Sequence, residues 1–337
     1  MYLKPAYDKN CVPVVFAASN SFVPYFAVCF QSMIENTSSC NNYDVILIES
    51  NVSEDNKKIL SAMVEDYQNI TLRFYNAQEL VKNYNLKANE HITTETYYRF
   101  LIQQVIPDYK KVLYLDSDMI INSDVAQLYN TDVDGYMVAA VRDAEFLGNI
   151  NGASKTIKAY ATEVLKMKNP YNYFQAGVLL FNETEMRKAY SLDQWLAFAS
   201  TPYKYNDQDV LNIYCEGRVK YIDMEWNLIT DCNHTRVSEV IVHAPEDIKT
   251  EYARATANPK IIHSAGHIKP WHNPQEDKAE YFWKYAEKTA YYNELLLKMN
   301  QYLHKNRLKI YLKNCILNNK MLKLFYSTAK KTVLKRK

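Results

Sequence analysis

The chain has 337 residues, of which 48% are hydrophobic and 23% charged, values typical of a globular protein with one large core or two modest ones. Its formal net charge of +2 conceals an asymmetry. Residues 298–337 contain 12 Lys and Arg and no Asp or Glu, which leaves 28 basic against 38 acidic residues in the body. An acidic body repels a polyanion, so we expect no nucleic-acid partner.

The cysteines and the apolar runs indicate the compartment. The six cysteines are scattered, without a C-x-x-C pair or a zinc-ligand spacing, as is typical of free thiols in a reducing compartment. No secretory signal is recognisable, and no apolar run reaches the roughly 18 residues of a membrane-spanning helix. We therefore expect an intracellular protein.

The first part of the chain alternates between strands and helices. Ser53 is placed to cap one of these helices. The pattern predicts βαβ units and a mostly parallel sheet, with functional sites at the carboxyl ends of the strands. Strands are expected at 13–18, 43–50, 69–76 and 111–118, and helices at 23–36, 52–67 and 92–106.

The second part contains further strands and ends in a helical region. Strands are predicted from 135 to about Asp143, over 173–182, and up to His263, and a short helix follows the loop at 206. From these patterns we expect a catalytic domain over 1–273 and a helical, basic region over 274–337.

Two carboxylates follow the most apolar strand, in the stretch KVLYLDSDMII. Asp116 and Asp118 would point to the same face of an extended chain, and Ser117 lets the chain turn between them. Like charges this close repel, and burying them without a partner is costly. The pair therefore predicts a site for Mg²⁺ or Mn²⁺ together with a phosphate. An Asx-turn closing a surface strand is the alternative.

The stretch IIHSAGHIKPW offers further groups for such a site. His263 ends a predicted strand and would add a nitrogen ligand, which favours Mn²⁺ over Mg²⁺. Gly266 would let a backbone N–H approach a phosphate, and Lys269 would supply a mobile positive charge. A buried histidine followed by a surface loop is the alternative.

The stretch NDQDVLN places acids and an amide near the start of a helix. Acids there stabilise a helix through its dipole, which is a sufficient structural reason for them. In a functional interpretation, Asp207 and Gln208 would hydrogen-bond a polyhydroxylated ligand.

Together these segments resemble the family 8 glycosyltransferases, which are retaining enzymes of the GT-A fold that use nucleotide sugars. The resemblance implies an α/β, Rossmann-like nucleotide-sugar-binding fold with a mostly parallel central sheet, followed by a helical, basic C-terminal extension. It extends to bacterial members that add galactose or glucose to lipopolysaccharide or other surface glycans. The matching segments occur in the family's order, from Val14 to Trp271: VVFAASNSFVPY, TTETYYRF, KVLYLDSDMII, FQAGVLLFN, NDQDVLN and IIHSAGHIKPW.

The resemblance also implies roles for individual residues. Asp116, Asp118 and His263 would bind Mn²⁺, or Mg²⁺, against the diphosphate of a UDP-sugar. Gly266 and Lys269 would contact that diphosphate. The other donor-binding positions are Ala17, Ala18, Ser19 and Ser21 for uridine, Ser117 between the two acids, and Arg99, Asp143, Gln175, Ala176, Asp207 and Gln208 for the transferred sugar.

The sequence departs from the family at two of these positions. Ser19 stands where an acid often contacts uracil, and Gln175 stands where Asn is usual. In the implied mechanism, the cation and Lys269 neutralise the leaving diphosphate, and the transition state resembles an oxocarbenium ion.

Retention of configuration requires either an enzyme nucleophile on the opposite face of the sugar or attack by the acceptor on the face of departure. No carboxylate in the matched segments is placed as a nucleophile, which favours same-face attack. We expect Gln208, Asp207 and Asp143 to be the catalytic residues.

The basic tail indicates contact with a membrane surface. Lys and Arg interleaved with apolar residues suit a helix on an anionic membrane, which would place the protein on the inner face of a bacterial cytoplasmic membrane with a glycan or lipid-linked glycan acceptor. A solvated tail without a partner is the alternative.

The rival functions are a glycan-binding protein without catalysis and a metal-dependent nucleotide-sugar hydrolase. The intact metal and phosphate residues disfavour the first, because a lectin needs no diphosphate site.

Overall fold

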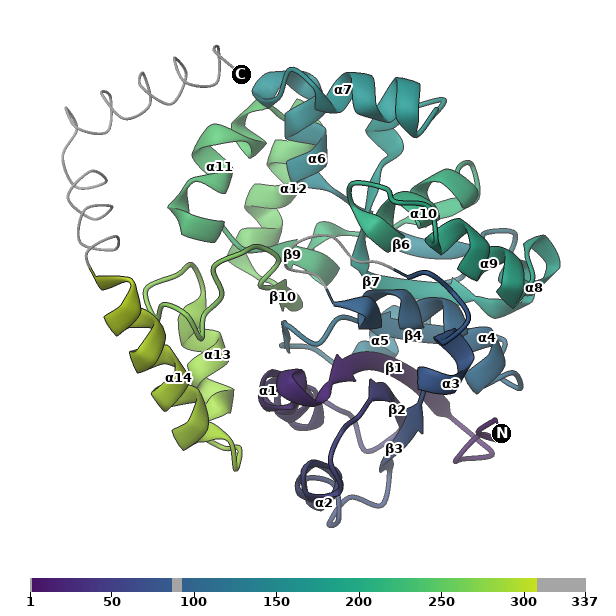
Figure 1. Cartoon of the computed structure of the whole chain (residues 1–337), viewed down its shortest axis with the longest axis vertical. Helices are drawn as coiled ribbons and strands as arrows, with labels where there is room; N and C mark the ends of the chain where they lie inside the picture. Colours follow the sequence, from purple (N-terminus) through teal and green to yellow (C-terminus); the bar gives the residue numbers. More distant parts are fainter. Residues whose placement is uncertain (1, 87–92, 308–337) are drawn as a thin grey trace.

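The computed structural model describes residues 2–86 and 93–307 (Figure 1). The basic tail from residue 308 and the expected start of a helix at Ile92 lie outside these ranges. The larger sheet has the strand order β3-β2-β1-β4-β7-β6-β8, and the smaller has the order β5-β10-β9. The strands are β1 (Cys11–Ser19), β2 (Asn42–Ser50), β3 (Ile70–Asn76), β4 (Lys111–Leu115), β5 (Met119–Ile121), β6 (Val138–Arg142), β7 (Phe174–Asn182), β8 (Val219–Tyr221), β9 (Leu228–Ile229) and β10 (Ile261–His263).

The larger sheet is mostly parallel, as predicted. β1 runs parallel to β2 and β4, β2 runs parallel to β3, and β6 runs parallel to β8. β7 is antiparallel to both of its neighbours, β4 and β6. The start of β7 therefore lies beside the carboxyl ends of β4 and β6, at the edge where a parallel sheet collects its functional residues.

Helices cover both faces of this sheet (Figure 1). Val14 and Phe16 of β1 pack in one hydrophobic cluster with α1 and α13, whereas Val15 packs in the other with η2, α4, α9 and α10. The longer helices are α1 (Val23–Glu35), α2 (Glu54–Ala62), the 3₁₀ helix η2 (Thr94–Leu101), α8 (Glu183–Ala189), α9 (Leu192–Ala199), α10 (Asn206–Tyr214), α12 (Glu246–Ala257), α13 (Ala279–Ala286) and α14 (Tyr292–Lys305). The short ones are α3 (Gln78–Val81), α4 (Ile102–Val105), α5 (Val125–Tyr129), α6 (Ala144–Gly148), α7 (Ile157–Ala159) and α11 (Arg236–Glu239). Short 3₁₀ helices are η1 (Asn20–Phe22), η5 (Pro170–Asn172), η6 (Met224–Asn227), η7 (Cys232–His234) and η8 (Ile241–His243), and π-helical turns are η3 (Asn149–Ala153) and η4 (Tyr160–Val164).

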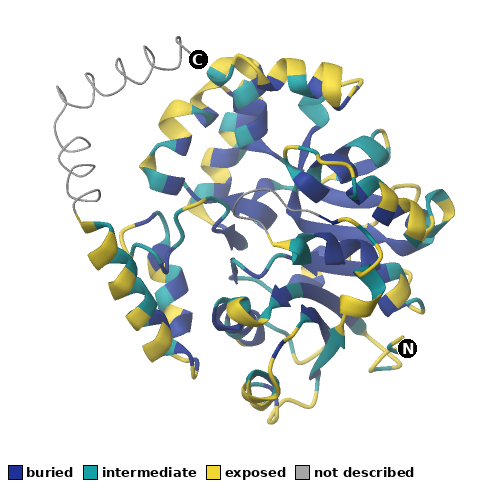
Figure 2. Ribbon diagram, in the orientation of Figure 1, coloured by how far each residue is buried: buried dark blue, intermediate teal, exposed yellow. Residues whose placement is uncertain are grey.

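Burial follows from this layering. The central strands are buried along most of their length, whereas α2 and α14 each present an exposed face (Figure 2). The predicted cap of α2 is confirmed, since the Ser53 side chain accepts a hydrogen bond from Asn56 N. The helix predicted over 92–106 differs in kind: the described part is η2 followed by α4.

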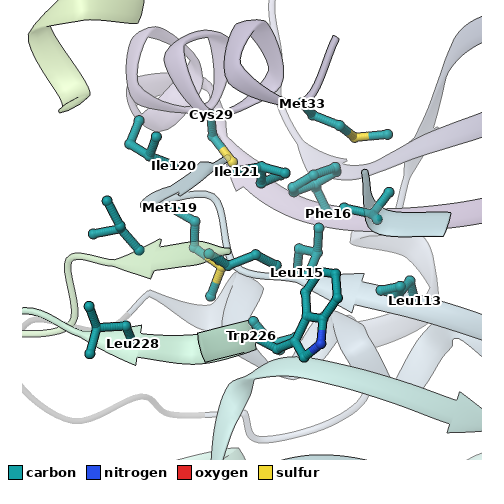
Figure 3. Close-up of a cluster of buried hydrophobic side chains, with 14 of the residues drawn as sticks. Phe16, Cys29, Met33, Leu113, Leu115, Met119, Ile120, Ile121, Trp226 and Leu228 are labelled. Carbon is teal, nitrogen blue, oxygen red and sulfur yellow. The ribbon is translucent and has the colours of Figure 1, made fainter. Parts of the chain in front are cut away.

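The smaller sheet joins two distant parts of the chain. β10 pairs antiparallel with β5, with His263 opposite Met119, and parallel with β9, with His263 opposite Ile229. Met119 and Ile121 pack over an apolar cluster that includes Phe16 (Figure 3). The cluster also contains Cys29, Met33, Leu113, Leu115, Ile120, Trp226 and Leu228. This core fixes the strand that ends at His263 beside the segment that follows Asp118.

The helices α13 and α14 pack against the loop that contains Lys269. Trp283 Nε1 donates to the Pro270 carbonyl at 3.3 Å, and the rings of His272 and Tyr302 stack with centroids 4.5 Å apart. No helix within 2–86 and 93–307 is both long and apolar enough to cross a membrane. The division of the chain at residue 273 stays a prediction.

Candidate functional site

The turn that contains the two acids is attached to three strands. Ser117 Oγ donates to the Ala17 carbonyl of β1 at 2.9 Å. The Asp116 N–H donates to the Gly177 carbonyl of β7 at 2.8 Å, and Asp118 O accepts from the N–H that follows β10 at 3.1 Å. These bonds hold both carboxylates at the carboxyl end of β4, as predicted from the apolar strand before them.

His263 completes the cluster of acids. Its Nε2 lies 3.2 Å from Asp118 Oδ1 and 3.8 Å from Asp116 Oδ2. One ligand atom from each of the three residues lies within 4.8 Å of the others, and no other group of this kind occurs in the described part of the chain. Two carboxylates and an imidazole are ligands that suit Mn²⁺. The predicted triad is therefore brought together and fits a divalent cation.

Positive side chains flank the acids. Lys269 Nζ lies 2.5 Å from Asp118 Oδ2, and Arg99 Nη2 lies 2.9 Å from Asp116 Oδ1. Burial disfavours the charged form of Asp118, but the Lys269 ammonium and His263 outweigh it and hold the pKa of that carboxyl well below its usual range. Burial raises the pKa of Asp116, and the Arg99 guanidinium opposes that shift.

Arg99 connects the acids to the start of α10. Its Nε lies 3.0 Å from Asp207 Oδ2, and its Nη1 donates to the carbonyl of Ala176 in β7. Burial raises the pKa of Asp207 to about 6, although Arg99 stabilises the ionised form. Three of the residues predicted to hold the transferred sugar are thus joined in one buried network.

Gln208 lies in the same network. Its Oε1 accepts from the Ala176 N–H at 2.9 Å, and its Nε2 donates to Asp143 Oδ2 at 3.0 Å. The other oxygen of Asp143 accepts from Phe146 N at 2.9 Å and so caps α6. Burial, with the nearby Glu145 carboxylate, raises the pKa of Asp143 to about 6.

The predicted uridine positions lie at the end of β1. Ala17 contacts the acid turn through its carbonyl, and the Ser19 and Ser21 hydroxyls are 3.1 Å apart. Gly266 has a φ of +145°, a conformation that favours glycine, and a Cβ there would lie 2.7 Å from Cys232 Sγ. In the described part of the chain, the hydrogen bond of these two hydroxyls joins them to each other and not to the acids.

Two asparagines outside the predicted set support the site. Asn212 donates to and accepts from the backbone of Phe174, both at 2.8 Å, and so attaches α10 to the start of β7. It lies four residues after Gln208, so helical spacing could have identified it. Asn227 Oδ1 lies 3.0 Å from His263 Nδ1. No local pattern marks Asn227, because its position depends on the pairing of β9 with β10.

Comparison with known proteins assigns the class of this fold and site. The profile described as Glycosyl transferase family 8 matches residues 13–275. The chain therefore belongs to glycosyltransferase family 8, and its solved structural neighbours have the GT-A glycosyltransferase fold.

Individual relatives show the extent of the similarity. Lipopolysaccharide 1,2-glucosyltransferase of Escherichia coli is 25% identical over 270 residues, 78% of this chain and 74% of that protein. Lipopolysaccharide 1,3-galactosyltransferase of Salmonella typhimurium is 28% identical over 230 residues, 66% of this chain and 61% of that protein. The chain spans 62% of the length of a related Haemophilus influenzae protein.

Two solved structures resemble most of this fold. The apo structure of the bifunctional glycosyltransferase WbbM has a TM-score of 0.78 and 26% identity, with 88% of this chain and 53% of that chain covered. The galactosyltransferase LgtC in complex with donor and acceptor sugar analogues has a TM-score of 0.66 and 24% identity, with 83% and 96% covered.

Proposed function

We propose that this protein is a metal-dependent, retaining hexosyltransferase. It transfers galactose or glucose from a UDP-sugar to a glycan or glycolipid acceptor in bacterial lipopolysaccharide or surface polysaccharide synthesis. The observation that carries the proposal is the cluster of Asp116, Asp118 and His263 with Lys269 beside it. The sugar and the product class come from the names of the E. coli and S. typhimurium relatives.

The residues of the cluster have distinct tasks in this proposal. Asp116, Asp118 and His263 would hold Mn²⁺, or Mg²⁺, which would supply Lewis-acid assistance to the departure of the diphosphate. Lys269 adds a positive charge on a flexible stem for the negative charge that develops on the leaving group. Gly266 allows the backbone of the same loop to approach a phosphate.

The network beside the cluster supports same-face attack by the acceptor. Asp207 is paired with Arg99, and Asp143 accepts hydrogen bonds from Gln208 and the α6 backbone. Both carboxylates are therefore engaged within the protein and poorly suited to form a covalent sugar intermediate. In the proposed step, the anomeric carbon–diphosphate bond breaks, the acceptor oxygen forms the new bond on the same face, and the acceptor proton passes to the leaving phosphate.

The tail is proposed to attach the enzyme to its acceptor's membrane. The 12 basic residues from 298 onwards would favour an anionic bilayer surface by about 1 kcal/mol for each one near the surface. A lipid-linked acceptor lies at such a surface, so peripheral attachment would place the site beside it. This proposal includes a location on the cytoplasmic side of the bacterial inner membrane.

A panel of UDP-sugars tests the proposed activity. The protein is mixed with each UDP-sugar and either Mn²⁺ or EDTA, and UDP release and thermal stabilisation are measured. We expect one UDP-hexose to stabilise the protein and to be consumed slowly only with Mn²⁺, and Asp118→Ala to abolish both effects. Absence of binding to every UDP-sugar with Mn²⁺ present, or undiminished activity of Asp118→Ala, contradicts the proposal.

A further inference from the structure

An irregularity in β7, beside the cluster of Asp116, Asp118 and His263, leaves the backbone N–H groups of Ala176 and Gly177 without partners on β6. Consecutive residues of β6, Ala140 and Val141, pair with Leu179 and Gln175 of β7, so residues 176–178 have no partners on β6. Side-chain oxygens accept hydrogen bonds from two backbone N–H groups of this segment instead. The Ala176 N–H donates to Gln208 Oε1, and the Gly177 N–H donates to Gln175 Oε1 at 2.5 Å. Such bulges commonly position side chains beside active sites.

The bond from Gly177 sets the direction of a chain of hydrogen bonds. A backbone N–H can only donate, so the Gln175 atom that it meets is the carbonyl oxygen. That oxygen also lies 2.5 Å from Asn227, which must therefore present its Nδ2 donor. The remaining atom of the Asn227 amide is then Oδ1, an acceptor, and it lies 3.0 Å from His263 Nδ1.

The chain of bonds determines the tautomer of His263. Because Asn227 Oδ1 only accepts, His263 Nδ1 carries the proton and donates it. In the neutral imidazole, Nε2 then has a free lone pair. Nε2 is the atom that lies 3.2 Å from Asp118 Oδ1 and 3.8 Å from Asp116 Oδ2. The tautomer is thus the one that a metal ligand at this position requires.

Packing holds the ring in this position. His263 is 3% exposed and Asn227 is 2% exposed, so water does not compete for the bond between them. Gly177 leaves the space that the imidazole fills, since a Cβ there would lie 2.4 Å from His263 Cε1. A buried donor left without an acceptor is costly, and this cost opposes rotation of the ring.

We propose that Gln175 and Asn227 are positioning residues of the metal site. They keep His263 in the Nδ1-protonated tautomer with Nε2 directed at the two acids. This inference rests on the proposed metal-dependent function. It gives Gln175 a task different from the expected sugar contact, because its carbonyl oxygen is already engaged by Gly177 and Asn227.

Four substitutions separate a positioning role from a sugar contact. Asn227→Leu removes the acceptor for His263, and Gln175→Met removes the carbonyl that orients Asn227. Gln175→Glu keeps an acceptor for Gly177 and Asn227 but loses the amide donors, so it preserves positioning and not donation to a sugar. Asn227→Asp likewise keeps an acceptor for His263.

The first measurement is made on metal-free protein. Nitrogen-15 NMR of histidine-labelled protein reports which ring nitrogen carries the proton, and the His263→Gln spectrum assigns the signal. We expect the proton on Nδ1 in the wild type and in Gln175→Glu, and a shift toward the Nε2-protonated tautomer in Asn227→Leu. A wild-type His263 with a proton on Nε2 and none on Nδ1 overturns the inference.

The second measurement is Mn²⁺ affinity, read from the electron paramagnetic resonance signal of free Mn²⁺. We expect Asn227→Leu and Gln175→Met to bind about 10–100-fold more weakly, as is usual when a supporting contact of a metal-bound histidine is lost. We expect Gln175→Glu and Asn227→Asp to lose clearly less than about tenfold in affinity, since each keeps an acceptor. Thermal unfolding of every variant excludes global unfolding as the cause.

The outcomes distinguish the inference from the proposed function. Wild-type protein that fails to bind Mn²⁺ overturns the metal-dependent function itself. Wild-type binding that Asn227→Leu and Gln175→Met leave unchanged overturns only the positioning role. A third outcome is that both Gln175 variants bind the sugar nucleotide more weakly while their Mn²⁺ affinity is unchanged. This result would assign Gln175 to the sugar and would also overturn the positioning role.

Discussion

Replacing Gly177 with Ala is a direct test of how tightly the site is packed. An added Cβ would lie 2.4 Å from His263 Cε1 and 2.8 Å from both His263 Nδ1 and Met119 Cε. Gly177 is not among the residues with positive φ, so alanine suits the backbone and the conflict is one of space alone. Ordinary contacts begin at 3.4 Å, so the imidazole must retreat by about 1 Å.

That displacement exceeds what a metal ligand tolerates, since ligand distances hold within about 0.2 Å. We expect Gly177→Ala to weaken Mn²⁺ binding by at least about 100-fold, because displacing a ligand costs more than losing one of its supporting contacts. We also expect overpacking to lower the free energy of unfolding by about 1–3 kcal/mol. The assay is a Mn²⁺ titration followed by electron paramagnetic resonance, with thermal unfolding measured in parallel.

Gly148→Ala provides a matched control. Its added Cβ would lie 2.3 Å from the Val240 carbonyl, so it also overpacks a buried position, but it lies in α6 and does not contact the cluster. We expect a comparable loss of stability and an unchanged Mn²⁺ affinity. Equal Mn²⁺ affinities of the wild type and Gly177→Ala would refute the argument that the close approach of Gly177 and His263 holds the ligand.

Two further predictions concern pH and the tail. Because the pKa of Asp143 is about 6, kcat/KM at saturating Mn²⁺ should fall as the pH drops through 6, when the carboxyl loses the charge that holds Gln208. The sign for stability is opposite: the pKa of Asp143 is raised above its usual 3.8, so its contribution to folding is favourable below about pH 4 and is lost as the pH rises through 6. A profile of kcat/KM against pH that is flat down to pH 5 would contradict the predicted loss of activity. Thermal unfolding measured over the same pH range tests the predicted sign for stability. Truncation after Arg307 keeps α14 and the stacking of Tyr302 on His272, so it should abolish binding to anionic vesicles and leave turnover of a soluble acceptor unchanged; persistent vesicle binding would contradict the tail proposal.

The sequence predicted the parts of the site that local patterns mark. Asp116 and Asp118 follow an apolar strand, and His263 ends another, so the expectation that functional groups gather at strand ends predicted that these three side chains lie together. The mostly parallel sheet followed from the alternation of strands and helices.

Features that depend on distant pairing could not be predicted. The direction of β7 is one, because a buried apolar run has the same composition whichever way it runs. Asn227 is another, because it reaches His263 only through the pairing of β9 with β10. The reversal of β7 explains why Gln175 and Ala176, at the beginning of a strand, lie beside residues at the ends of others.

The pairing of β5 with β10 has a consequence for how the protein withstands unfolding. It joins residues 119–121 to 261–263, so the carboxylates and the imidazole come from opposite halves of the chain. A cation held between them would act as a non-covalent crosslink across the long intervening loop. At a concentration 100 times its Kd, such a ligand adds about 2.7 kcal/mol to the free energy of unfolding. Resistance to heat and proteolysis would then depend in part on the supply of the ion, because the net free energy of unfolding of a protein is only about 5–15 kcal/mol.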